Sequence, residues 1–205
     1  MTSLKPDADQ IKSVLNNLAK QDWVRRTERR WWPQFLFHYT DIRNAVQILR
    51  EGYLYSRKHL KNENKPVISS GSPPVLAVTK IAIKDSVRLY LRPKTPTQYY
   101  SEGIRSQTTL AQSKFPQAHC PVPVFFLFDS AKILAHSDCR FSDGNLASRN
   151  AHIFATASEL EQLPWRKIYH TALHLLPLRS RKGNFVISAS AGLESLPKPS
   201  CCQHT

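Results

Sequence analysis

Acidic side chains are scarce in this chain of 205 residues. It carries 15 Asp and Glu residues against 29 Lys and Arg residues, which gives a formal net charge of +14 at pH 7. A surplus of this size favours a polyanionic partner, most simply nucleic acid. The alternative is a basic surface that serves solubility or a protein partner.

Several common signatures are missing as well. There is no run of about 18 apolar residues, the length that a membrane-spanning helix needs, so we expect no contact with a membrane. The first ten residues lack the apolar stretch of a secretory signal, and we therefore expect a cytoplasmic location. The four cysteines form no C-x-x-C pair, which argues against a disulfide framework and a structural metal. The sequence also lacks a P-loop, a Rossmann glycine fingerprint, a nucleophile elbow and a zinc-protease motif.

What the chain does contain is enough apolar material for a core: 41% of its residues are hydrophobic and 10% are aromatic. Apolar residues at helical spacing predict a helix over residues 7–22. Four arginines then recur at three- and four-residue steps among tryptophans, in the segment 23–32. Such a segment can contact phosphates and stack on bases. The alternative is a solvated arginine face that its tryptophans anchor to the core.

The rest of the chain predicts short strands mixed with short helices. Apolar runs or alternation predict strands at 35–38, 53–55, 75–78, 87–91, 122–128, 168–170 and 185–187. Short helices are predicted at 41–51, 129–134 and 160–165, and a turn at 141–145. We expect Thr40 to cap the first of these helices and Gly52 to end it. Because the order lacks a regular βαβ rhythm, the predicted class is α+β with antiparallel or mixed sheets.

Two segments could carry chemistry. His38 and Thr40 stand at a predicted strand end, where either side chain could hydrogen-bond a ribose hydroxyl. By themselves they are better explained as a structural histidine and a helix cap. In the segment 92–100, Arg92 or Lys94 could contact phosphate and a tyrosine such as Tyr99 could stack on a flat ring. A proline-stiffened loop with exposed charge is the alternative.

Taken together, four segments resemble the DarT-like family, NAD-dependent ADP-ribosyltransferase toxins that modify DNA bases. Residues 37–52 resemble its opening motif, a His and a Thr, an Asn six residues after the His, then Ile-Leu and a Gly. Residues 87–99 are similar to its second motif, a strand that runs into Arg-Pro-x-Thr-Pro. Residues 126–129 and 141–145 match a later strand and an Asp-Gly turn. The likeness covers roughly residues 38 to 187, with the four segments in the family's order.

The resemblance implies an ADP-ribosyltransferase fold of two packed mixed or antiparallel sheets, with peripheral helices and a cleft for NAD. It implies transfer of ADP-ribose from NAD to a base of single-stranded DNA without a metal, and it leaves an antitoxin partner open. By position, the NAD-binding residues would be His38, Tyr39, Thr40, Asn44, Arg57 and Tyr90, and the DNA-binding residues Arg92, Lys94 and Tyr99. The implied divisions are a basic helical extension at 1–34, the transferase domain at 35–188 and a loose, divergent tail at 189–205.

The chain departs from the family at one decisive position. The family places a catalytic glutamate in a strand near its C-terminus, and Asn184 stands at that position here. An amide can hydrogen-bond a ribose hydroxyl but carries no negative charge to stabilise an oxocarbenium-like transition state. Three functions therefore stay open: an active transferase, a degenerate member that still binds NAD and DNA, and a nucleic-acid-binding module without NAD chemistry.

Overall fold

The computed structural model describes residues 3–69, 85–93, 95, 98, 101–113, 116, 119–144, 146, 151–170, 185–188 and 193–194, the last two ranges as backbone alone. Its centre is a six-stranded sheet in which every neighbouring pair is antiparallel. The strands, in spatial order, are β4 (Pro123–Asp129), β1 (Phe35–Asp41), β3 (Val87–Tyr90), β7 (Phe185–Ser188), β5 (Cys139–Ser142) and β6 (Ile153–Phe154). This arrangement confirms the α+β class with antiparallel sheets.

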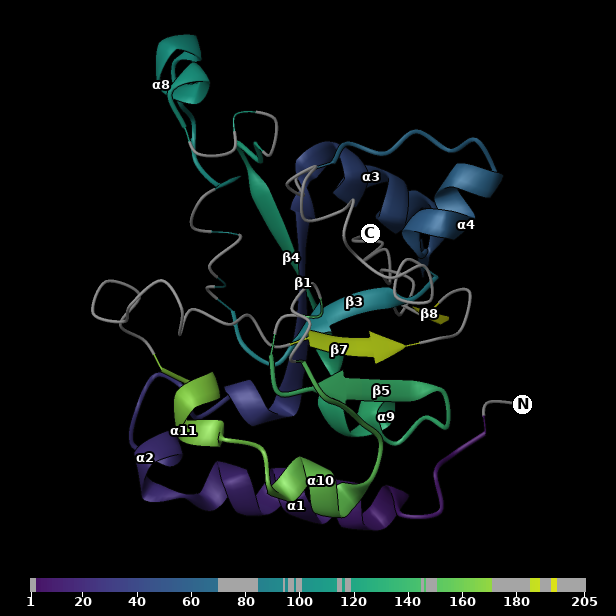
Figure 1. Cartoon of the computed structure of the whole chain (residues 1–205), viewed down its shortest axis with the longest axis vertical. Helices are drawn as coiled ribbons and strands as arrows, with labels where there is room; N and C mark the ends of the chain where they lie inside the picture. Colours follow the sequence, from purple (N-terminus) through teal and green to yellow (C-terminus); the bar gives the residue numbers. More distant parts are fainter. Residues whose placement is uncertain are drawn as a thin grey trace, which may run out of the picture.

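The sheet consists of two blocks of strands that meet at one point. Strands β1 and β4 pair along their whole length, from Phe35 opposite Asp129 to Asp41 opposite Pro123. Between β1 and β3 the register holds a single pair, Phe37 opposite Tyr90. Figure 1 shows the consequence, since β1 and β4 run across the direction of β3, β7 and β5. The two blocks of strands are thus joined into one strongly twisted sheet.

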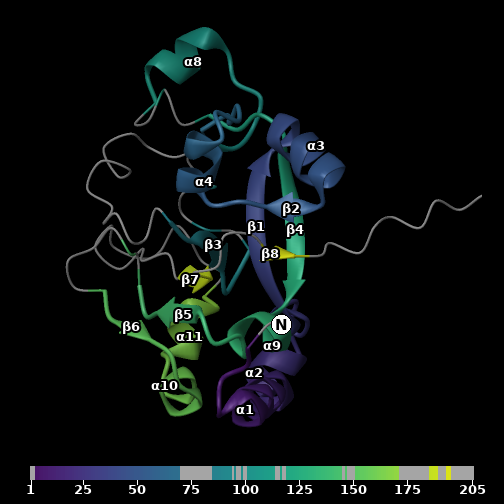
Figure 2. The ribbon, with the colours of Figure 1, turned by 90° about the vertical axis from the view of Figure 1, so that its right-hand side faces the viewer.

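One end of the molecule is a layer of short helices around one long helix (Figures 1 and 2). The long helix α1 (Ala8–Lys20) buries Ile11, Leu15 and Leu18, and it packs against the neighbouring helices of the layer. The layer is completed by α2 (Asp22–Arg25), the 3-10 helix η1 (Trp32–Gln34), α9 (Ser130–Leu134), α10 (Ala157–Glu161) and α11 (Trp165–Ile168). The apolar side chains of α1 belong to the same buried cluster as those of β1 and β3. The helix predicted at 7–22 is therefore confirmed, and it shares the main core.

The opposite end carries α3 (Ile42–Glu51), β2 (Tyr53–Leu54), α4 (Arg57–Asn62) and the projecting α8 (Gln107–Ala111) (Figure 1). Helix α3 begins one residue later than predicted, because Asp41 and not Thr40 is its cap. The Asp41 carboxylate accepts the backbone N–H of Arg43 at 2.9 Å and the Arg43 Nε–H at 2.7 Å. Gly52 ends the helix with a φ of 76°, as predicted, a conformation that glycine adopts without strain.

Three of the five apolar residues of α3 are turned to solvent. Ala45 is buried and Ile48 packs against the core. Ile42, Val46 and Leu49, in contrast, are 44%, 42% and 55% exposed. The helix contacts the sheet through a narrower stripe than its apolar residues suggest.

Between residues 141 and 170 the predicted elements were partly wrong. Phe141 and Ser142 belong to β5, so the predicted turn begins only at Asp143. The segment predicted as one helix at 160–165 belongs to two helices. α10 ends at Glu161, and α11 begins at Trp165, directly after Pro164. The strand predicted at 168–170 is instead the end of α11. Its buried residues Trp165, Ile168 and Tyr169 recur at helical spacing, which lets one turn of helix face the core.

Two further corrections concern the ends of the chain. Helix α2 ends at Arg25 and turns follow it, so the arginines of 25–30 do not share one helix face. The tail expected to be loose contains a short strand, β8 (Leu193–Glu194), which pairs antiparallel with β2. The strand predicted at 75–78 lies outside the described residues. Within the part of the chain that the structure describes, no helix is long and apolar enough to cross a membrane.

Candidate active site

His38 lies in the middle of β1, where the neighbouring strand β3 fixes its ring. Its Nδ1 is 3.1 Å from the backbone carbonyl oxygen of Arg88. A carbonyl only accepts, so Nδ1 carries the proton and Nε2 is the acceptor nitrogen. Burial lowers the pKa of His38 below its ordinary value of 6.5, which the hydrogen bond to Arg88 only partly offsets. The ring is therefore neutral at pH 7 and can accept a hydrogen bond from a hydroxyl group.

Asn44 forms a bridge between α3 and the segment that follows α4. Its Nδ2 donates to Thr40 Oγ1 at 3.0 Å and to the carbonyl of Ile68 at 2.8 Å, and its Oδ1 accepts the Ile68 N–H at 2.9 Å. We call these three bonds the Asn44 bridge. Because both ends of the amide bind the protein itself, Asn44, a position predicted to contact NAD, holds the backbone of Ile68 in place. A contact between Asn44 or Thr40 and NAD stays a prediction.

Two tyrosines stand where the two blocks of strands meet. The rings of Tyr39 and Tyr90 lie 5.9 Å apart, and Tyr39 also packs on Phe125 at 6.2 Å. Tyr39 is only 8% exposed, whereas Tyr90 is half-buried. Burial raises the pKa of both hydroxyls, so neither is ionised near neutral pH. Tyr39 thus belongs to the core, and Tyr90 offers the more accessible ring.

Arg57 and Arg88 form a pair of like charges, which we call the guanidinium pair. Arg57 opens α4 and Arg88 lies on β3, and both views place α4 just above β3 (Figures 1 and 2). Arg57 is half-buried and donates to Ser69 Oγ at 3.1 Å. Its pKa is lowered by burial and, secondarily, by the positive charge of Arg88.

No carboxylate among the described residues forms an ion pair with either member of the guanidinium pair. Other basic residues nearby are neutralised, because Lys58 binds Asp85 at 2.8 Å and Lys65 binds Glu51 at 2.6 Å. Two repelling cations in a half-buried position favour an anionic ligand between them, most strongly one with phosphate oxygens. The structure thus gives Arg57, which was predicted to bind NAD, a positively charged neighbour in Arg88.

Arg92 binds the protein's own backbone, and its predicted contact with DNA stays a prediction. Its Nη1 donates to the carbonyl oxygens of Ile168 at 3.1 Å and His170 at 2.8 Å. These bonds tie the end of β3 to the end of α11. Burial lowers the pKa of Arg92 without changing its charge near neutral pH, so it supplies a permanent donor to the two carbonyls.

Three predicted residues, Lys94, Tyr99 and Asn184, lie outside the described residues. Asn184 directly precedes β7, whose register with β3 runs from Phe185 opposite Tyr90 to Ser188 opposite Val87. Glu194, the nearest downstream carboxylate, belongs to another sheet, where its backbone pairs with Tyr53. This placement gives no support to a replacement of the missing glutamate by Glu194.

No short-range pattern in the sequence indicates the partners of these residues. Ile68 and Ser69 fall in a polar stretch, and their bonds to Asn44 and Arg57 span 24 and 12 residues. Among the described residues, there is no group of three or more His, Cys, Asp or Glu side chains that could hold a metal ion.

Comparisons with known proteins place this geometry in a family. A family model described as "ssDNA thymidine ADP-ribosyltransferase, DarT" matches residues 37–182. The fold is similar to the structure of Thermus sp. 2.9 DarT in complex with ADP-ribosylated ssDNA, with a TM-score of 0.61 at 20% identity over 79% of this chain and 77% of that one. It is also similar to the NAD+ complex of the same DarT, with a TM-score of 0.56 at 19% identity over the same shares.

A third similar structure is Thermosipho africanus DarTG in complex with ADP-ribose. Its TM-score is 0.52 at 18% identity, over 75% of this chain and 40% of that one. A comparison with curated protein sequences gave no significant match. The family match covers well over half of the chain. It includes His38 on β1, Asn44 on α3 and both members of the guanidinium pair. The chain belongs to the DarT family of ADP-ribosyltransferases.

Proposed function

We propose that this protein transfers the ADP-ribose unit of NAD to thymidine in single-stranded DNA. The observation that carries the proposal is the guanidinium pair beside His38, within the segment that matches the family. The formal net charge of +14 supports a polyanionic substrate.

The described residues fit NAD as the donor. NAD, when bound, supplies an ADP-ribosyl group attached to nicotinamide as the leaving group. Arg57 and Arg88 would hold its diphosphate, because two adjacent guanidinium groups match two negative phosphates. Neutral His38 would accept a hydrogen bond from a ribose hydroxyl through Nε2. The ring of Tyr90 would pack against a flat part of the donor.

The weak point of this chemistry is Asn184. If Asn184 occupies the position of the family's glutamate, the ribose cation that develops in the transition state lacks its counter-charge. The loss of one preorganised electrostatic contact lowers a rate by about 100- to 1,000-fold. This residue favours a second candidate function, in which the protein binds NAD and single-stranded DNA but transfers ADP-ribose slowly or not at all.

The cellular role follows from the family resemblance alone. An enzyme that modifies DNA bases inside its own cell would act as a toxin and would need an antitoxin partner. We therefore propose a cytoplasmic toxin, with residues 1–34 and 189–205 as extensions of a transferase domain at 35–188. Lys94 and Tyr99 remain the proposed DNA contacts of that domain.

One experiment separates the two candidate functions. The protein and an Asn184→Glu variant are each incubated with NAD and single-stranded DNA of mixed sequence, and the DNA is resolved on a denaturing gel. Slower-migrating DNA with the unaltered protein establishes the transferase. A shift with Asn184→Glu alone identifies a protein that binds both substrates but has lost transfer. Oligonucleotides without thymidine test the base, since they should not shift.

If neither form shifts the DNA, the transferase proposal is wrong. NAD binding then decides the second candidate. A ligand that binds only the folded state raises the unfolding temperature in proportion to the logarithm of its concentration. Absence of that rise would leave a nucleic-acid-binding module.

A further inference from the structure

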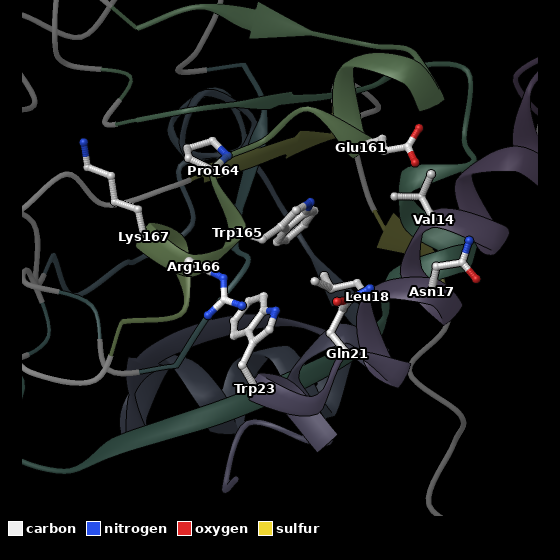
Figure 3. A pocket seen from close by; sticks show the side chains of 10 residues that line it. All are labelled: Val14, Asn17, Leu18, Gln21, Trp23, Glu161, Pro164, Trp165, Arg166 and Lys167. Atoms are coloured by element: carbon white, nitrogen blue, oxygen red, sulfur yellow. The ribbon is translucent and has the colours of Figure 1, made fainter. Parts of the chain in front are cut away.

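The helical layer contains a groove, and its lining residues are distant in sequence from the guanidinium pair. The groove has a volume of about 440 Å³ and lies between α1, α2 and α11, and we call it the Trp23 groove. Its aromatic walls are Trp23 and Trp165, its cations are Arg166 and Lys167, and Leu18 and Gln21 close it from α1 and the turn after it (Figure 3). A cavity of this volume suits a ligand the size of one nucleotide.

The aromatic part of the groove is rigid. Trp165 is 8% exposed, and its indole N–H donates to the carbonyl of Leu160 at 3.0 Å. Trp23 is half-buried and packs on Tyr169 with the ring centroids 6.2 Å apart. The core thus fixes both tryptophans, and for Trp23 this agrees with the anchoring interpretation of segment 23–32. Trp23 nevertheless keeps part of its ring in the groove, where a flat ligand can reach it.

The charged part of the groove is exposed. The guanidinium of Arg166 lies over the face of the Trp23 ring, 4.9 Å from its centre, and Figure 3 shows the two side chains next to each other. Arg166 and Lys167 are both exposed, and neither forms an ion pair with a described carboxylate. Arg25 and Arg26 are exposed as well, but they bind Asp22 at 2.7 Å and 3.6 Å. One carboxylate, Glu161, also lines the groove; in the view of Figure 3 it lies on the far side of Trp165 from Lys167.

We infer that the Trp23 groove binds single-stranded DNA, with a base beside Trp23 and two successive backbone phosphates at Arg166 and Lys167. Aromatic rings interleaved with cations are the means by which proteins bind single strands without reading their sequence. Only an unpaired base can enter the groove, which excludes duplex DNA. The formal net charge of +14 makes a polyanion a better complement than an acidic protein patch of lower charge density.

The position of the groove links it to the proposed active site. Helix α11 carries Trp165, Arg166 and Lys167, and Arg92 ties the end of this helix to the end of β3 through the Ile168 and His170 carbonyls. The end of β3, the strand that carries Tyr90, is thus joined to the helix that carries the two cations of the groove. The inference rests on the proposed function in one respect, namely that the strand in the groove is the DNA substrate itself.

The test measures binding of a labelled single strand of about 20 nucleotides by fluorescence anisotropy, without NAD. The groove variant is Arg166→Glu with Lys167→Glu, and the matched control is Lys12→Glu with Lys132→Glu, two exposed residues of α1 and α9. We expect the groove variant to bind about 10-fold or more weakly than the control, which has the same net charge. The slope of log K against log[salt] should fall by about 1.4, because two phosphate contacts are lost.

A second pair of variants tests the base. Trp23→Leu should weaken binding at least 5-fold, about the lower limit for one stacked base, and Trp23→Phe should retain most of the affinity. If Trp23→Leu lowers the unfolding temperature, the surface charge variants still decide the question. Equal loss of affinity in both double variants, or no loss in the groove variant, would overturn the inference.

Transfer of ADP-ribose is measured separately, with an oligonucleotide of about four nucleotides, too short to occupy the active site and a second site together. Equal transfer to it by the groove variant and the control, together with the expected loss of affinity for the long strand, supports the inference. If no form transfers ADP-ribose but the groove variant still loses affinity for the long strand, the proposed function fails and the groove stands as a DNA site. If transfer occurs but binding of the long strand is insensitive to the groove, the inference alone fails.

Discussion

The Asn44 bridge and the guanidinium pair lie at the same end of the molecule and serve the fold in opposite ways. In the bridge, the Asn44 amide binds Thr40 and Ile68, so its polar groups are satisfied by the protein. In the pair, Arg57 and Arg88 repel each other and lack a carboxylate among the described residues. The bridge builds the site, and the pair is left for a ligand. The family's motifs thus contain residues of both kinds, Asn44 in the first and Arg88 in the second, and the motif pattern alone does not distinguish them.

The largest effect is expected from the guanidinium pair. Arg57→Ala should lower NAD affinity, or transfer in whichever form is active, by about 100-fold, because an electrostatic contact to the donor is lost. It should leave the free energy of unfolding unchanged or slightly higher, since a repulsion between two cations is removed. Thermal shift with NAD measures the first quantity and urea unfolding the second. Lys58→Ala, next to Arg57 and paired with Asp85, is the control and should bind NAD normally. Normal NAD binding by Arg57→Ala would show that the guanidinium pair is not a ligand-binding group.

The bridge should respond in stability first. Asn44→Ala leaves the N–H and carbonyl of Ile68 without their partner, which costs about 1–3 kcal/mol of folding free energy when such groups stay buried. Hydrogen exchange at the Ile68 amide should accelerate by a corresponding factor. Gln47→Ala on the same helix removes only a 3.2 Å bond to Glu51 and serves as the control. If Asn44→Ala were as stable as Gln47→Ala yet failed to bind NAD, Asn44 would belong with the ligand-binding groups.

A smaller loss of stability is expected when Arg92 is replaced. Like the Asn44 bridge, its side chain binds backbone groups of the protein itself. Arg92→Gln removes the charged donor from the carbonyls of Ile168 and His170, and we expect a cost of about 1.5 kcal/mol. Its effect on DNA affinity should be no greater than that of neutralising an exposed cation such as Lys132. A loss of DNA affinity well beyond the Lys132→Gln control would restore Arg92 as a DNA contact.

The smallest effect concerns the protonation of His38. Burial lowers its pKa in the folded state, so the unfolded chain binds the proton more tightly. Its contribution to stability is fully present above the ordinary pKa of 6.5 and is lost as the pH falls through the folded value. The unfolding temperature should therefore fall on acidification below that pH, and less steeply in His38→Gln. An identical pH profile for both proteins would show that the imidazole is not protected in the folded state.

Local patterns in the sequence determined many of the elements. The helical spacing of Ile11, Leu15 and Leu18 predicts α1 because one face of a helix must be apolar to pack. The apolar runs at 35–37 and 124–128 predict the two strands of the longest pairing, and Gly52 predicts the end of α3. The charge and the ordered motifs predict an NAD-dependent enzyme that acts on DNA, and the family match confirms the motifs.

Tertiary structure decided what each polar residue binds. The partners of Arg92 lie 76 and 78 residues further along the chain, and the crossing of the two strand blocks depends on the single pair of Phe37 and Tyr90. Local propensity also cannot choose between Thr40 and Asp41 as the cap of α3, because both side chains can accept a backbone N–H. Packing made the choice: β1 continues through Asp41, so the helix starts one residue later. Long-range contacts and burial, which no local window contains, thus separate the residues that hold the site together from those left to bind a ligand.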